Sequence, residues 1–224
     1  MKTISKRDLE LCTPLYFDVI IRQALPGRNP FTENNRQNRV IFIHIPKNAG
    51  RSIYSAVLNE SGRHIPLRRY YAYDSNFVDA CFKFAVVRHP VDRFVSAFNG
   101  LKGSAKGEDE YSRFVRKHIE PFASVEDFVV WMASSQANTA RVLGWLHFWP
   151  QHKWVTVGGG VMLDEILYFE SLNEYWPAFA DLHGFPGGLP FIGKARKKCS
   201  KLEPKLDVFL RDVYRSDFEL FGYL

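Results

Sequence analysis

The chain has 224 residues, of which 46% are hydrophobic and 15% aromatic, so it can bury the core of one large domain or two small ones. Lysine and arginine number 30 against 24 aspartates and glutamates, and the net charge of +6 favours an anionic ligand or surface without naming one. No stretch approaches the roughly 20 apolar residues that span a bilayer, which argues against a membrane-spanning protein.

The N-terminus and the cysteines bear on the compartment. The opening segment MKTISKRDLELCTPLYF has scattered charges and lacks the apolar stretch of a signal peptide. Cys12, Cys81 and Cys199 lie far apart, form no metal or redox pair, and fit a reducing environment. We therefore expect a cytoplasmic protein, with a trimmed form of a membrane-anchored enzyme as the alternative.

Strand and helix patterns alternate along the chain. Residues 1–38 are mixed in character and are expected to form an extension that packs on the domain, ending in a polar surface loop. In chain order the predicted elements are a strand over 40–44, a helix over 51–59, a strand over 81–87, a helix from Pro90 to a stop at Gly100, a mobile loop over 101–110, helices over 110–119 and 124–132 (with Ser124 and Asp127 as a capping box), a strand over 165–170, a helix over 171–183 and a last helix over 203–214. This alternation predicts a single α/β domain over residues 1–224, with a mainly parallel central sheet flanked by helices.

The first strand leads into a turn that suits an anion. In IPKNAGRS, Gly50 lets the backbone approach a ligand, and the helix that follows offers N–H groups and its positive end. Arg51 and Ser52 add donors in the first helical turn, and Lys47 can reach over the loop as a point charge. The lysine precedes the glycine, so the Walker A order of a nucleotide-triphosphate loop is absent. An ordinary strand–turn–helix with a surface lysine is the alternative.

A second cationic position follows the next strand. Arg88 comes directly after it, where ligands of parallel sheets bind, and Ser96 lies about two helical turns later. Together they can bind a second phosphate. Arg93 is either a further contact or a solvated helix charge, and the alternative for Arg88 is a structural ion pair.

These two motifs together resemble the sulfotransferase superfamily, whose loop P-K-x-[AG]-G-[ST]-[ST] and motif R-x7-S appear here as PKNAGRS and RHPVDRFVS. Arg51 departs from the loop pattern, so the hydroxyl role rests on Ser52. Within the superfamily the chain is similar to the carbohydrate sulfotransferases of the Golgi type and their shorter bacterial relatives. Softer similarities lie in LHFWPQ, ILYFESLNEYW and VYRSDFELFGY, so the match covers about residues 40–223.

The resemblance implies a P-loop-like, three-layer fold and the donor 3′-phosphoadenosine 5′-phosphosulfate (PAPS), with no metal. It implies that the loop residues Lys47, Asn48, Ala49, Gly50, Arg51 and Ser52 bind the 5′ end of the donor, and that Arg88 and Ser96 bind its 3′-phosphate. Lys47 would stabilise charge on the oxygen between phosphate and sulfate as the sulfuryl group leaves. The basic run over 193–201 is either a solvated patch or a loop that closes over the donor, with Arg196, Lys197 and Lys198 as candidates.

The acceptor hydroxyl needs a general base. His147 matches the family's histidine in LHFWPQ and is the first choice, while His152 and Glu170 stay open as alternatives. His89 and His44 are expected to be structural or supporting. Four nearby aromatic residues either stack on a sugar or belong to the core, which is the favoured interpretation: Trp145, Phe148, Trp149 and Trp154.

We therefore expect an enzyme that moves a sulfuryl group from PAPS to a hydroxyl of a carbohydrate, glycolipid or other hydroxylated acceptor. A P-loop kinase or NTPase is disfavoured by the missing Gly-Lys-Ser/Thr order. A non-catalytic polyanion binder ranks last, because the charge surplus is modest and no nucleic-acid motif is present. Neither the particular acceptor nor the oligomeric state follows from the sequence.

Overall fold

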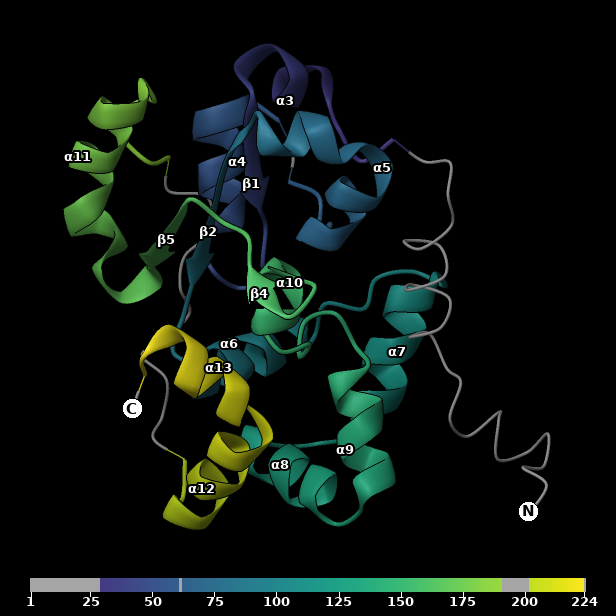
Figure 1. Ribbon diagram of the computed structural model, residues 1–224. Coiled ribbons are helices and arrows are strands. Elements are labelled where there is room, and N and C mark those ends of the chain that lie inside the picture. The colour runs from purple at the N-terminus through teal and green to yellow at the C-terminus, as the bar shows by residue number, and fades with distance from the viewer. Residues whose placement is uncertain (1–28, 61, 191–201, 224) are drawn as a thin grey trace, which may run out of the picture.

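A computed structural model describes residues 29–60, 62–190 and 202–223 (Figure 1). Within them the main sheet has three parallel strands, with β2 (Phe82–Val87) between β1 (Val40–Ile43) and β5 (Glu165–Tyr168). Every residue of β1 and all but the first of β2 are buried, as expected for strands covered on both faces. The three predicted strands are confirmed, each shorter by one or two residues at an end.

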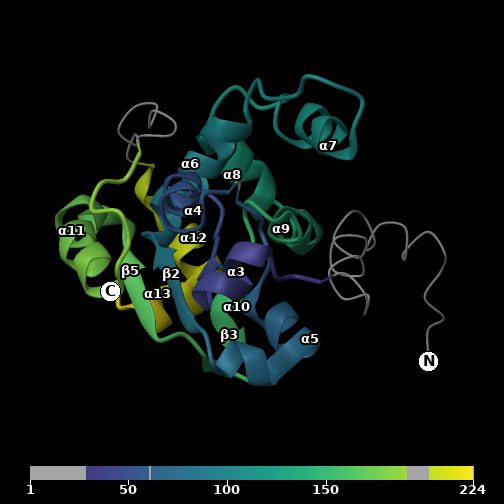
Figure 2. The same cartoon turned by 90° about the horizontal axis from the view of Figure 1, so that it is seen from above.

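Helices cover both faces of this sheet, which gives the predicted three layers (Figure 2). Val40 and Phe42 of β1 pack with α4 (Gly50–Leu58) and α11 (Leu172–His183). Ile41 and Ile43 point to the opposite face, because side chains alternate along a strand. That face is covered by α5 (Leu67–Asp79), α10 (His152–Val155) and α13 (Arg215–Phe221). The α/β class is therefore confirmed.

A second, helical core lies beyond the carboxyl end of the sheet, in the lower half of Figure 1. Its helices are α6 (Pro90–Leu101), α7 (Glu110–His118), α8 (Val125–Ala133), α9 (Gln136–Leu143), α12 (Pro204–Val213) and part of α13. The capping box of Ser124 and Asp127 at the start of α8 is confirmed. A small antiparallel pair, β3 (Thr156–Val157) and β4 (Gly160–Val161), and a 3-10 turn over Phe169–Ser171 complete the described elements.

Several local predictions were wrong. The expected surface loop before β1 contains the helix α3 (Glu33–Asn38), because Thr32 and Asn35 cap it reciprocally. The helix predicted from Pro90 is present as α6, and it ends at Leu101, one residue beyond the predicted stop at Gly100. The helices α5, α9 and α13 were not predicted, since their stability comes from tertiary packing.

The predicted N-terminal extension is described only from residue 29 onward. There Phe31 is buried and packs edge-on against Tyr70 and Phe77 of α5. The rest of the extension, residues 1–28, lies outside the described residues. Within the described ranges, no helix combines the length and the apolar character needed to cross a bilayer.

Candidate active site

The loop between β1 and α4 has an unusual backbone. Lys47 and Ala49 both have left-handed conformations, with φ of 76° and 59°. For residues other than glycine this costs about 1–3 kcal/mol each, and such strain is concentrated at functional sites. Ala49 supplies no side-chain cap to α4, so the N-cap residue itself leaves the first N–H groups of the helix without a side-chain acceptor. The loop therefore presents an uncapped helix end, which suits an anion.

Asn48 holds the loop on its inner side. Its buried side-chain amide donates to Val86 O and to Gln151 Oε1, both at 2.8 Å. Gln151 in turn accepts a hydrogen bond from Arg88 N at 3.0 Å and donates to Arg88 O at 2.7 Å. The side chain of Asn48 thus bonds to the protein interior. The contact with PAPS that was predicted at this position would have to come from the Asn48 backbone.

Gly50 is required by close packing. A Cβ atom there would lie 1.8 Å from Cδ2 of His44, so a side chain does not fit without displacing the imidazole. Burial lowers the pKa of His44 to about 2, which keeps its ring neutral. His44 therefore supports the loop as an uncharged packing group, in line with the supporting role predicted for it.

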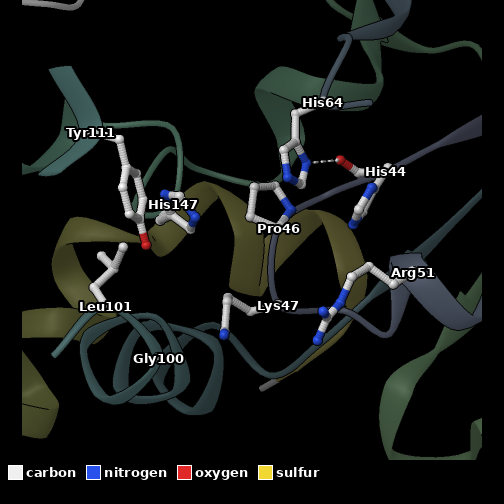
Figure 3. A pocket seen from close by; sticks show the side chains of 9 residues that line it. All are labelled: His44, Pro46, Lys47, Arg51, His64, Gly100, Leu101, Tyr111 and His147. Atoms are coloured by element: carbon white, nitrogen blue, oxygen red, sulfur yellow. Dashed lines mark hydrogen bonds between the residues drawn. The ribbon is translucent and has the colours of Figure 1, made fainter. Parts of the chain in front are cut away.

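A pocket of about 350 Å³ opens beside this loop (Figure 3). Its lining comes from the loop, from the segment before α5, from the end of α6, from the start of α7 and from the chain after α9. The lining residues are His44, Pro46, Lys47, Arg51, His64, Gly100, Leu101, Tyr111 and His147. The structure thus brings Lys47, Arg51 and His147, three of the predicted site residues, to one cavity.

Lys47 extends across the pocket toward α6. A Cβ atom at Gly100 would be 2.4 Å from its Nζ, so this glycine leaves the space that the ammonium group occupies. Burial, followed by the nearby charges of Arg88 and Arg51, lowers the pKa of Lys47. An ammonium group held against two guanidinium groups is favourable only when an anion joins them.

Arg88 lies next to the loop, as predicted. Its Nη1 donates to Lys47 O at 3.3 Å, and its guanidinium stands 4.3 Å from the centre of the Phe169 ring. In the described parts of the chain no carboxylate forms an ion pair with it, so the alternative of a structural ion pair has no support. Ser96 is half-buried on α6. Neither Arg88 nor Ser96 lines the pocket of Figure 3.

Arg93 corrects both interpretations offered for it. It is fully buried rather than solvated, and it donates from Nη1 to His147 O at 3.1 Å and from Nη2 to Trp149 O at 2.6 Å. Its role is to hold the segment that carries His147.

Three histidines line the pocket: His44, His147, which was the predicted base, and His64. Burial lowers the pKa of His147 to about 3, and its buried Nδ1 has no partner in the described part of the chain. His64 was missed. Its Nδ1 lies 3.0 Å from His44 O, which can only accept, so Nδ1 carries the proton and Nε2 is left as an acceptor. Burial also lowers the pKa of His64. The rings of His147 and His64 are 6.3 Å apart.

The alternative bases are engaged elsewhere. His152 Nδ1 is 2.7 Å from Oδ1 of Asp217, a fully buried carboxylate. Glu170 accepts from His89 N at 2.7 Å and from the Tyr223 hydroxyl at 2.9 Å. Neither His152 nor Glu170 lines the pocket.

Among the predicted aromatic residues, the core interpretation holds. Trp145, Phe148, Trp149 and Trp154 are all at most 5% exposed. Tyr111, which the sequence reasoning missed, is the aromatic residue that lines the pocket instead. No pattern marks His64 or Tyr111, because each reaches the cavity only through contacts between distant segments.

Two further predictions concern the basic run near the C-terminus and metal binding. Arg196, Lys197 and Lys198 lie outside the described residues. Within those residues, no group of three or more histidine, cysteine or acidic side chains is arranged to hold a metal ion.

Comparison with known proteins identifies the class. The family model described as "Sulfotransferase family" matches residues 34–224, so the chain belongs to the sulfotransferase family. The predicted resemblance to carbohydrate sulfotransferases is thereby confirmed at the level of the family. Membership makes the protein a transferase and supports sulfuryl transfer as its activity. No curated protein and no solved structure matches the chain significantly.

Proposed function

We propose that the protein transfers the sulfuryl group of PAPS to a hydroxyl group of a carbohydrate or glycolipid acceptor. The observation that carries this proposal is a single cavity in which the Lys47 ammonium, at an uncapped helix end, faces the neutral imidazoles of His147 and His64. A cation for the leaving group and a base for the attacking hydroxyl are thus within one site.

The donor's 5′ end fits the loop. Lys47, Arg51, the Ser52 hydroxyl and the first N–H groups of α4 would hold the phosphosulfate, and Arg88 with Ser96 would hold the 3′-phosphate. The acceptor oxygen forms a bond to sulfur while the bond from sulfur to the bridging oxygen breaks. Lys47 would stabilise the charge that this oxygen gains, and such electrostatic stabilisation is typically worth about 10²–10³ in rate.

His147 is the proposed base. With a pKa of about 3 in the free protein it is unprotonated at neutral pH, which a base must be, but it is weak. The negative charge of a bound donor would raise this pKa toward neutrality, since an anion favours the protonated imidazole. His64 is a second candidate because it lines the same pocket as His147 and Lys47. Substituting each by glutamine separates them, since loss of the base should lower kcat by about 10²–10⁴.

The test is transfer of labelled sulfate from PAPS to a panel of glycans. Lys47→Ala should lower kcat by about 10²–10³ with an unchanged melting temperature. Lys153→Ala is the matched control, because Lys153 has an exposed side chain and does not line the pocket. Unchanged turnover in Lys47→Ala would refute the proposed role of this residue. A desulfated nucleotide that bound away from the loop would refute the proposal as a whole.

A further inference from the structure

The far end of the pocket, opposite Arg51, has its own chemistry. In Figure 3, Tyr111, Leu101 and His147 lie on the side away from Arg51, with Lys47 between the two ends. The charged residues among the described lining are Lys47 and Arg51, and no carboxylate is among them. The end formed by Tyr111, Leu101 and His147 is therefore uncharged, because the pKa of His147 is about 3.

The hydroxyl of Tyr111 is fixed by its neighbours. Ser104 Oγ lies 2.6 Å from Leu101 O, to which its single proton is donated. Tyr111 Oη lies 2.7 Å from the same Ser104 oxygen, so the proton between these two oxygens comes from Tyr111. The tyrosine oxygen is thus left as a hydrogen-bond acceptor. Asp109 caps the first turn of α7, the helix that carries Tyr111.

The charge balance limits what can bind at this end. The phosphosulfate end of the donor carries two negative charges, which match Lys47 and Arg51. Among the described lining residues no further cation remains for a second anion. A carboxylate on the acceptor would therefore be buried without a cationic partner, which should lower binding at least about tenfold.

We propose that the acceptor is an uncharged sugar ring seated against Tyr111, and that Tyr111 determines specificity by accepting a hydrogen bond from a ring hydroxyl. The inference rests on the proposed function. A sugar fits better than a simple alcohol because the site offers more than one polar group, the Tyr111 oxygen and the His147 ring, beside the apolar Leu101. The volume of about 350 Å³ is near the lower limit for small-molecule sites and suits one ring beside the transferring group.

The first experiment compares matched acceptors with the full chain and saturating labelled PAPS. Methyl glycosides of neutral hexoses are paired with the uronates of the same stereochemistry, and a phenol is added. We expect kcat/KM to be at least about tenfold higher for a neutral hexoside than for its uronate, because the uronate carboxylate would be buried unpaired. Equal or better use of the uronate, or labelling of the phenol alone, would overturn the inference.

The second experiment assigns the role of Tyr111. Tyr111→Phe should raise KM for the neutral hexoside about three- to tenfold, with little change in kcat. Tyr175→Phe is the control, since Tyr175 is exposed on α11. The variant should make no difference for the deoxy-hexoside that lacks the hydroxyl bound by Tyr111. An equal loss with every deoxy-hexoside would contradict the proposed contact.

Binding of the desulfated nucleotide, measured by calorimetry, distinguishes a failure of the proposed function from a failure of the inference about the acceptor. Wild type and Tyr111→Phe should bind it equally, because Tyr111 lies at the acceptor end. If the wild-type protein bound no nucleotide and labelled no acceptor, the proposed function itself would fail. If it bound the nucleotide and preferred uronates, only the present inference would fail.

Discussion

Gly100→Ala should separate catalysis from stability. The new Cβ atom would lie 2.4 Å from Nζ and 3.3 Å from Cε of Lys47, whereas ordinary contacts begin near 3.4 Å. The ammonium group must therefore move by about 1 Å. A displacement of this size at a catalytic group costs up to about 10²-fold in rate, so we expect kcat for sulfuryl transfer to fall about 10- to 100-fold.

Stability should change in the opposite direction. Gly100 is in the last turn of α6, and alanine is favoured over glycine in a helix by about 0.5–1 kcal/mol. Because the tip of a lysine side chain moves easily, the clash costs little, and the melting temperature should rise by about 1–4 °C for a chain of this size.

The assays are sulfate transfer at saturating donor and thermal unfolding followed by circular dichroism. Asn99→Ala is the control, because Asn99 is exposed and adjacent in the same helix. It should also raise the melting temperature slightly while leaving kcat unchanged. A Gly100→Ala protein with full activity would show that Lys47 does not occupy this space in the reacting complex.

Three further outcomes follow from the charges of the site. The pKa of Lys47 is lowered in the free protein and would rise beside a bound anion. The affinity for the desulfated nucleotide should therefore weaken as the pH rises above the free-state pKa, and this loss should begin at a lower pH than for an ordinary lysine. Calorimetry across pH 7–10 measures the affinity. The pKa of His147 near 3 predicts that kcat/KM, which reports the free enzyme, has no acid limb at the usual histidine value of about 6.5, and a limb there that disappeared in His147→Gln would contradict the assignment. Asp217→Ala should lower the free energy of unfolding by about 3–5 kcal/mol in urea titrations. The reason is that this buried carboxylate accepts hydrogen bonds from Gln151 N at 2.7 Å and from His152 N at 2.8 Å, and also contacts the His152 ring. A loss below about 1 kcal/mol would refute that role.

Local patterns in the sequence predicted much of the fold. Continuous apolar runs predicted β1 and β2, and a serine followed three residues later by an aspartate predicted the start of α8. These signals are readable because hydrophobic periodicity and capping depend on residues close together in the chain. Helix α5 was missed because its mean polarity hides a narrow buried face of Leu67, Tyr70 and Val78.

The same distinction applies to the candidate site. By itself the sequence determined the strand–turn–helix around Lys47 and Gly50, the arginine at the end of β2, and membership of the family, all of which depend on short motifs. Only the tertiary structure decided that Arg93 is buried, that Gly100 makes room for Lys47, and that His64 and Tyr111 join His147 at one cavity. The physical reason is that these roles arise from packing between segments far apart in the chain, and no local pattern of residues records which of them will meet.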